Sequence, residues 1–235
     1  MADQPRNTTR TLVSMLYVSK YGICGQTVNS LLGSVLSGSF KDCEYLFVID
    51  HTHVSGRNRA AKAAMDQGFD YLLFLDSDMD WPPETLPRLI DCKADVACID
   101  MWSRGIPSFR LVSKKNDKGL VAPVEDDIAG KGGVSDIDTC GMGCTLIRTD
   151  LLRRMAEKIE APLWFQASSH SEDVSFCYLA KQLCNASIKC DFGLLAGHYT
   201  TIRASGQDFM RDYKNRWGDV ADKESPKYSS ISNME

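Results

Sequence analysis

The 235-residue sequence lacks any apolar stretch long enough to cross a membrane as a helix. It also lacks an excess of positive charge, because 27 lysine and arginine residues stand against 31 acidic residues and leave a net charge of −4. This balance argues against a nucleic-acid-binding protein that depends on bulk positive charge. Since no apolar signal core follows Met1, we expect a cytoplasmic protein without integral membrane association.

The nine cysteines form no Cys-x-x-Cys pair and show no repeated spacing. The two that are closest in sequence, Cys140 and Cys144, enclose Gly-Met-Gly, which suits a tight turn better than a zinc site. Cys98, Cys177 and Cys190 stand in apolar contexts, where cysteine acts as a small core residue. The cysteines therefore indicate a reduced protein.

Strand-like and helix-like segments alternate over the first hundred residues, which predicts an α/β fold with a mostly parallel central sheet and helices on both faces. The expected strands are Leu12–Val18, Tyr45–Ile49, Tyr71–Leu75 and Asp95–Ile99. The expected helices are Gly25–Leu36, a helix over 57–67 with Ser55 as its cap, and Pro83–Ile90.

The pattern is less regular after residue 101. Residues 102–138 predict a loop-rich insertion with hairpin strands. Beyond it we expect a strand over 145–147, helices over 150–159 and 173–183, and a strand over 188–195. We expect one domain at 1–222 and a flexible tail at 223–235.

The most informative segment is the apolar run Tyr71–Leu75, which is followed by three alternating carboxylates at Asp76, Asp78 and Asp80. The run is short enough to be a strand buried on both faces, and two prolines stop it from continuing. Ligands of open α/β sheets bind at the carboxyl ends of the strands. Because three neighbouring anions repel one another without a cation between them, the segment predicts a site for a hard divalent metal.

Several known patterns contain acids at this spacing. A calcium loop of the EF-hand type needs glycine where Trp81 stands and glutamate where Pro87 stands, so we reject it. A phosphatase of the haloacid-dehalogenase type would have threonine or valine at Asp80, and that reading stays open but weaker. A solvated strand end without a function is a further alternative. The Asp-x-Asp of glycosyltransferases fits best, because a metal held there stabilises a diphosphate leaving group.

Candidate partners for such a site occur elsewhere in the chain. Arg57 and Arg59 begin the helix before the carboxylate strand, where guanidinium groups reach phosphate or ribose. Glu172 and Asp173 open an apolar helix, where they either complement the helix dipole or deprotonate a hydroxyl group. His198 follows a strand and is either a structural residue or a ligand.

In this order the motifs resemble those of the GT-A glycosyltransferases, especially the family 2-like group. The matching segments are Arg57-Asn58-Arg59, Phe74-Leu75-Asp76-Ser77-Asp78, Gly141-Met142-Gly143-Cys144-Thr145-Leu146-Ile147-Arg148, Glu172-Asp173 and Gly197-His198. The resemblance covers the chain from about Leu12 to Thr200. It departs from the family at Ile49-Asp50-His51, where an Asp-Asp-Gly-Ser type of turn is usual. It also lacks a Gln-x-x-Arg-Trp signature after the Glu-Asp helix, which argues against processive polysaccharide synthesis.

The resemblance implies a role for each position. Asp78 and His198 would bind the metal, with Asp76 as a further ligand or a contact to the ribose or sugar. Asp173 would be the catalytic base of an inverting enzyme, with Glu172 as its neighbour. The remaining donor-binding residues would be Ser19 and its neighbours Val18, Lys20 and Tyr21, together with Asp50, Arg57 and Arg59.

The sequence thus predicts a GT-A (Rossmann-like) glycosyltransferase that uses Mn²⁺ or Mg²⁺ and a UDP- or GDP-sugar donor. Its acceptor would be a carbohydrate or another hydroxyl compound, bound beside Trp102, Arg104 and Phe109. The alternatives are a GT-A-fold nucleotidyltransferase and a non-catalytic nucleotide- or sugar-binding module. Asp80 receives no role, and we expect the following Trp81-Pro82-Pro83 to turn it toward solvent.

Overall fold

The computed structural model describes residues 9–18, 22–50, 52–104, 108–116, 121–160, 163–166 and 170–199. The predicted donor-binding residue Ser19, its neighbours Lys20 and Tyr21, and the predicted tail at 223–235 lie outside these residues.

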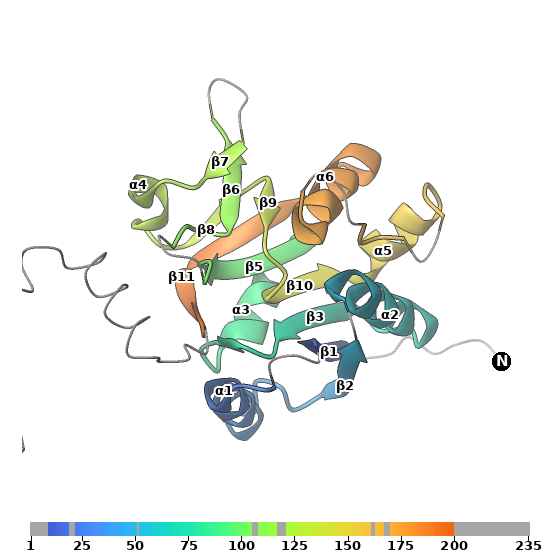
Figure 1. Cartoon of the computed structure of the whole chain (residues 1–235), viewed down its shortest axis with the longest axis vertical. Helices are drawn as coiled ribbons and strands as arrows, with labels where there is room; N and C mark the ends of the chain where they lie inside the picture. The colour runs from blue at the N-terminus through green and yellow to red at the C-terminus, as the bar shows by residue number, and fades with distance from the viewer. Residues whose placement is uncertain are drawn as a thin grey trace, which may run out of the picture. The chain divides into compact units, whose positions relative to one another are not determined.

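The chain begins with a parallel unit of three strands (Figure 1). β1 (Thr11–Val18) pairs in parallel with β2 (Cys43–Asp50) on one side and with β3 (Tyr71–Asp76) on the other. The connections are α1 (Gly25–Leu36) and α2 (His53–Asp66). Parallel pairing follows from these connections, because each helix carries the chain back to the edge where the next strand begins.

The complete sheet has eight strands in the order β2-β1-β3-β10-β5-β11-β4, and β8 pairs with β11 outside this path. The later strands are β4 (Met79–Asp80), β5 (Val96–Met101), β8 (Val134–Asp136), β10 (Cys144–Arg148) and β11 (Ile188–His198). β5 and β11 are parallel to each other, whereas β4 and β8 run antiparallel to β11. The fold is therefore mixed α/β, with a parallel core to which antiparallel strands are added.

The sheet departs most from the predicted parallel arrangement at β10, which runs antiparallel to both of its neighbours, β3 and β5. β5 ends at the same edge of the sheet as β3. The chain then passes through the insertion and returns at Gly141, still at that edge. Since no helix carries the chain back across the sheet here, β10 has to run in the opposite direction.

The insertion contains the hairpin that the sequence predicts. β6 (Val112–Lys115) pairs antiparallel with β7 (Val121–Pro123) and with β9 (Thr139–Cys140), and the short helix α4 (Asp126–Ala129) follows β7. Buried Arg110 ties the insertion to the sheet, because it donates to the Asp100 carboxylate of β5 at 2.8 Å and to the Val124 carbonyl at 2.7 Å.

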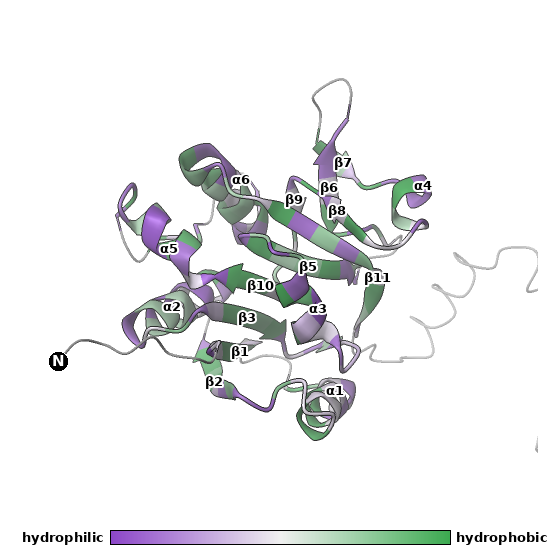
Figure 2. Ribbon diagram, turned by 180° about the vertical axis from the view of Figure 1, so that it is seen from behind, coloured by the Kyte–Doolittle hydropathy of each residue, from purple (hydrophilic) through white to green (hydrophobic). Residues whose placement is uncertain are grey.

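Helices cover both faces of the sheet. α2, α5 (Thr149–Ala156) and α6 (Glu172–Cys184) lie on the face toward the viewer in Figure 1, and α3 (Thr85–Asp91) lies on the face toward the viewer in Figure 2. The central strands are hydrophobic along most of their length, as Figure 2 shows and as burial between two helical layers requires. Phe165 stacks on Phe176 of α6 with a 4.5 Å centroid distance and meets Phe74 of β3 edge-on at 5.6 Å.

Several predicted boundaries are wrong, among them the end of α5, which lies at Ala156 rather than at residue 159. Two of the differences have a clear local cause. α2 begins at His53 rather than Arg57, because the hydroxyl group of Thr52, not that of Ser55, accepts the capping hydrogen bond. β11 continues to His198, three residues beyond the predicted end, because Gly197 and His198 pair with β4. All nine cysteines are free, and among the described residues no helix meets the length and hydropathy of a membrane span.

Candidate active site

One buried arginine, Arg57, lies among three carboxylates at the end of β3. Its guanidinium group donates to both oxygens of Asp76, at distances of 3.2 and 3.1 Å. Its Nε lies 3.5 Å from Oε1 of Glu172 and 3.3 Å from Oδ1 of Asp173. We call these four residues the Arg57 cluster. The cluster joins α2, β3 and α6 at the edge of the sheet where α/β proteins bind ligands.

The single cation of the Arg57 cluster does not balance its three acids. Burial would lower the pKa of Arg57, but the carboxylates raise it above its usual value, so the guanidinium group stays charged. Burial also opposes the ionisation of Glu172, yet Arg57 holds the pKa of Glu172 below its ordinary value. Burial raises the pKa of Asp173 to about 8, against the opposing effect of Arg57 and with the help of Glu172 and Asp76. Asp173 is therefore the member of the cluster that exchanges a proton near neutral pH, as a general acid or base does.

The turn Gly141-Met142-Gly143 brings backbone groups between Asp76 and Asp173. The Met142 N–H donates to Oδ2 of Asp173 at 3.1 Å, and the Gly143 carbonyl accepts from the Asp76 N–H at 2.9 Å. A Cβ atom on Gly143 would lie 3.2 Å from Cγ of Met79 and 3.4 Å from Oδ2 of Asp76, so the turn packs closely against both side chains. The turn thus orients Asp173 through Oδ2. The Asp173 side chain is 19% exposed, whereas its Oδ1 is buried beside Arg57 and has no hydrogen-bond partner among the described residues.

A second pair of predicted residues, Asp78 and His198, meets just beyond the Arg57 cluster. Oδ1 of Asp78 lies 3.6 Å from Nε2 of His198, and Oδ2 of Asp78 accepts from Nη1 of Arg104 at 2.6 Å. Burial would raise the pKa of Asp78, but His198 and Arg104 outweigh it, and the pKa lies below its ordinary value. Nδ1 of His198 is 2.9 Å from the Trp102 carbonyl, an acceptor, so Nδ1 carries the proton. Nε2 is the ring nitrogen that faces Asp78.

Asp80 does not point to solvent, and that expectation is wrong. Its carboxylate accepts from the Gly197 N–H at 2.6 Å and from the Tyr199 hydroxyl at 2.5 Å. The hydrogen bond to Asp80 raises the pKa of Tyr199 to about 12. A Cβ atom on Gly197 would lie only 2.5 Å from Oδ1 of Asp80, which explains the glycine before His198. Asp80 fixes the end of β11 and so positions His198 beside Asp78.

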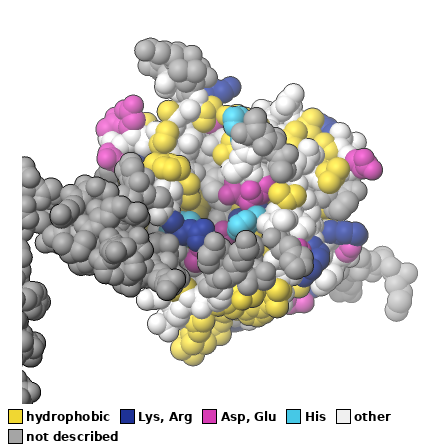
Figure 3. Space-filling view, viewed as in Figure 1, with side chains coloured by type: hydrophobic (Ala, Val, Ile, Leu, Met, Phe, Trp, Pro, Cys, Tyr) yellow, Lys and Arg dark blue, Asp and Glu magenta, His cyan; other side chains and the backbone are white. Residues whose placement is uncertain are grey.

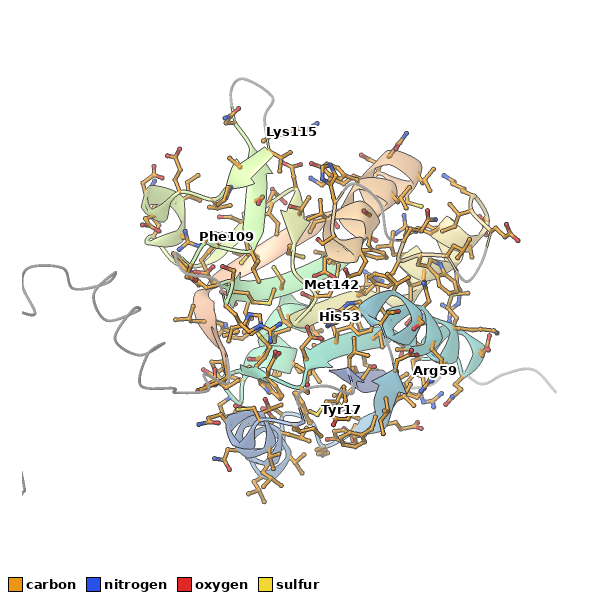
Figure 4. The ribbon with its side chains drawn as sticks, viewed as in Figure 1. Tyr17, His53, Arg59, Phe109, Lys115 and Met142 are labelled. Carbon is orange, nitrogen blue, oxygen red and sulfur yellow. The ribbon has the colours of Figure 1, made fainter. Side chains whose placement is uncertain are left out.

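The remaining predicted donor-binding residues lie at the end of β2. Asp50 accepts from the Ser55 hydroxyl at 2.5 Å, and Nη1 of Arg59 lies 3.6 Å from Oδ2 of Asp50. Arg59 is 57% exposed, and Figure 4 shows it away from the Met142 turn. The structure therefore brings Asp50 and Arg59 together, but as a pair apart from Arg57.

Sequence reasoning missed the contacts that three other residues make at the site. Arg104, which we expected on the acceptor side, ion-pairs with Asp78 from a position 26 residues away. His53 lies close enough to Glu172 to help lower the pKa of that carboxyl, and Figure 4 shows His53 near Met142 in the same view. The Met142 N–H reaches Asp173, and the flanking glycines were its only signal in the sequence. Asn58 of the Arg-Asn motif has a structural role, because its side chain bonds both backbone groups of Phe165.

Acidic, basic and histidine side chains gather near the centre of the face drawn in Figure 3. Within the described ranges, no group of three or more histidine, cysteine or acidic residues is arranged to hold a metal. Both oxygens of Asp76 bond to Arg57, so the protein offers Asp78 and His198 as two candidate ligands. Carboxylate oxygen and imidazole nitrogen both suit Mn²⁺, and Mg²⁺ and Mn²⁺ commonly complete their ligand set with phosphates and water. The pair therefore fits a divalent ion that is held jointly with a phosphorylated ligand.

Comparison with known proteins gives a likeness of fold. No protein-family model matches the chain, and no curated protein matches it. Among solved structures, the crystal structure of A197 from STIV is similar over 82% of this chain and 87% of that chain, with a TM-score of 0.53 and 21% sequence identity. At this level of identity the likeness shows that the α/β arrangement recurs in another protein, and nothing further.

The Arg57 cluster predicts opposite pH dependences for Asp173→Asn and Glu172→Gln. The raised pKa of Asp173 means that its contribution to stability is fully present below about pH 4 and is lost as the pH rises through about 8. Asparagine cannot ionise, so the variant does not lose this contribution. The free energy of unfolding of Asp173→Asn, taken relative to that of the wild type, should therefore rise by about 1–3 kcal/mol from about pH 4 to about pH 8.

Glu172→Gln is the matched control, because the pKa of Glu172 is lowered. Its contribution is present above the ordinary pKa of a glutamate and is lost as the pH falls, so this variant should be most destabilised at neutral pH. Urea unfolding at a series of pH values measures both trends. Two variants whose stability differences from wild type do not change with pH would contradict the electrostatic description of the cluster.

Proposed function

We propose that this chain is a metal-dependent glycosyltransferase of the GT-A type, which moves a sugar from a nucleotide-sugar donor to a hydroxyl acceptor. The observation that supports it most is the meeting of distant motifs at one edge of the sheet. Arg57, Asp76 and Asp173 come from three different elements and form a single ion-paired cluster. Asp78, two residues beyond Asp76, lies beside His198 from the last strand. The resemblance in sequence requires this grouping, whereas unrelated polar residues would have no reason to meet.

The Asp78–His198 pair is suited to the donor side. A Mn²⁺ or Mg²⁺ ion bound there would offset the negative charge that collects on the departing nucleotide diphosphate. Asp78 is ionised at neutral pH, because its pKa lies below the ordinary value, and His198 presents Nε2 because Nδ1 donates to Trp102. Arg104 contacts Oδ2 of Asp78, and from this position its guanidinium group would also bind a diphosphate held beside Asp78.

The Arg57 cluster is suited to the acceptor side. Asp173 has a partly exposed side chain, and its raised pKa makes it a stronger proton acceptor than an ordinary aspartate once it is ionised. In the proposed reaction Asp173 takes the proton of the acceptor hydroxyl group. Arg57 holds Asp76 in a fixed orientation through two parallel hydrogen bonds, so Asp76 can contact the sugar or ribose of the donor without moving.

Asp78→Ala should abolish the metal-dependent hydrolysis of a nucleotide-sugar donor, because it removes the acidic ligand that the described residues offer to the proposed ion. The assay measures the release of UDP or GDP from a panel of UDP- and GDP-sugars in the absence of any acceptor. Each donor is tested with and without Mn²⁺. A loss of about 100-fold or more is expected.

Asp66→Ala serves as the control, since it removes an exposed carboxylate that pairs with Lys62 on the surface of α2. It should leave hydrolysis unchanged. Hydrolysis at the wild-type rate by Asp78→Ala would contradict the assignment of Asp78 as a metal ligand. Donor binding without turnover in the wild type would favour a binding module, and release of pyrophosphate from a nucleoside triphosphate with a sugar phosphate would favour a nucleotidyltransferase.

Asp173→Asn should stop sugar transfer but leave donor binding intact, because asparagine keeps the shape of the side chain and cannot accept the proton. The expected loss in turnover is about 100-fold or more, and the donor affinity measured by calorimetry should change little. Asp150→Asn removes another acid from the first turn of a helix and should change neither value. Turnover at the wild-type level in Asp173→Asn would refute the base role.

A further inference from the structure

The exposed hydrophobic side chains are concentrated in one region, around α1 and β2. Among the described residues twelve large hydrophobic side chains are exposed, and eight of them lie in or next to these two elements. The eight are Ile23, Val28, Leu32, Val35, Leu36, Tyr45, Phe47 and Ile49. Figure 3 shows hydrophobic side chains gathered along the lower part of the drawn face, over this part of the chain. We call the eight residues the α1–β2 patch.

The amphipathic character of α1 is reversed with respect to an ordinary surface helix. Its buried residues are polar, since Thr27 donates to the Met79 carbonyl at 2.6 Å and Ser34 accepts from Nε1 of Trp81 at 3.1 Å. Its outward stripe is apolar and follows helical spacing, with Leu32 53% and Leu36 84% exposed. A helix that turns its apolar side outward leaves that side for a partner.

β2 presents a second unpartnered surface. It lies at the end of the sheet and, within the described ranges, pairs with β1 alone. Its eight residues pair without a bulge and include no proline and no lysine, which are common protections of an edge strand, and its two charged residues, Glu44 and Asp50, leave the stretch between them uncharged. Phe47 and Ile49 point away from α2, because the alternate residue Val48 is buried on the α2 side.

The charges around the patch indicate the kind of partner. The segment 22–40, which includes α1, contains no charged residue. Two copies of α1 can therefore meet without bringing like charges together, which favours a two-fold interface, whereas β2 carries acids at Glu44 and Asp50 near its two ends. The charges that flank the segment in the sequence are of both signs, Lys20 and Lys41 with Asp42 and Glu44, and so do not form the purely basic rim that an anionic membrane attracts.

We propose that the α1–β2 patch is the interface through which two copies of this chain form a symmetric dimer. The β2 edges meet antiparallel across the two-fold axis, and the apolar stripes of the two α1 helices close over the partner's β2. The exposed area of the eight side chains is on the order of 800 Å², the amount that each partner contributes to a standard-size interface. This assembly is independent of the proposed transferase reaction, because no residue of the Arg57 cluster or of the Asp78–His198 pair takes part.

Sedimentation velocity of the full chain tests the proposal. Across roughly a hundredfold range of protein concentration the wild type should shift from monomer to dimer, because association follows mass action. Phe47→Glu and Leu36→Glu each place a charge in the apolar surface that the other copy covers and should each weaken dimerisation at least about tenfold. Val134→Glu changes a residue of similar exposure on another edge strand, β8, and should dimerise like the wild type.

Circular dichroism of each variant shows whether it is folded, so that loss of the dimer is not mistaken for loss of structure. A wild type that stays monomeric at every concentration would overturn the proposal, as would dimers of unchanged affinity in both glutamate variants. A monomer that sediments with phosphatidylcholine–phosphatidylglycerol vesicles would assign the patch to a lipid surface instead.

Discussion

The buried ion pair between Arg57 and Asp76 is the interaction on which the rest of the candidate site depends. It fixes the end of β3 against α2 and leaves Nε of the same guanidinium group for the two acids that open α6. A buried cation among three carboxylates also sets the order in which they ionise, since Glu172 keeps its charge while Asp173 holds a proton to higher pH. Removing Arg57 would leave the carboxylates of the cluster without their cation, and uncompensated buried charge is strongly destabilising.

Backbone geometry extends this constraint to the second half of the site. The Gly141-Met142-Gly143 turn contacts Asp76 and Asp173 because β10 re-enters the sheet at the edge where β3 ends. On the other side, Asp80 holds Gly197 and Tyr199, and this contact positions His198 beside Asp78. The three alternating acids therefore have three different environments. Asp76 pairs with Arg57, Asp78 lies beside His198 and Arg104, and Asp80 accepts hydrogen bonds from Gly197 and Tyr199. The repulsion expected among them is relieved separately for each.

Much of the fold follows from the sequence pattern. The bounds of α1 agree with the prediction, and the predicted strands and helices follow one another in the predicted order, with β4 added before α3, because the hydrophobic period is a local signal. The direction of β10 carries no local signal, since it depends on where the insertion leaves and re-enters the sheet. The pairing of Asp78 with Arg104 likewise depends on the path of the insertion. Asp80 was misread because its partners Gly197 and Tyr199 lie more than a hundred residues away. The apolar spacing of α1 predicted an ordinary amphipathic helix, because periodicity does not show which side of a helix faces the core.

The central claim is that Asp78 and His198 form an incomplete metal site that a nucleotide diphosphate completes. Titration of Mn²⁺ followed by electron paramagnetic resonance, with and without UDP or GDP, tests this claim most directly. By linkage, each ligand should strengthen the binding of the other, so the affinity for Mn²⁺ should rise at least about tenfold when the matching nucleotide is present. Equal affinity for Mn²⁺ with and without either nucleotide would contradict the account.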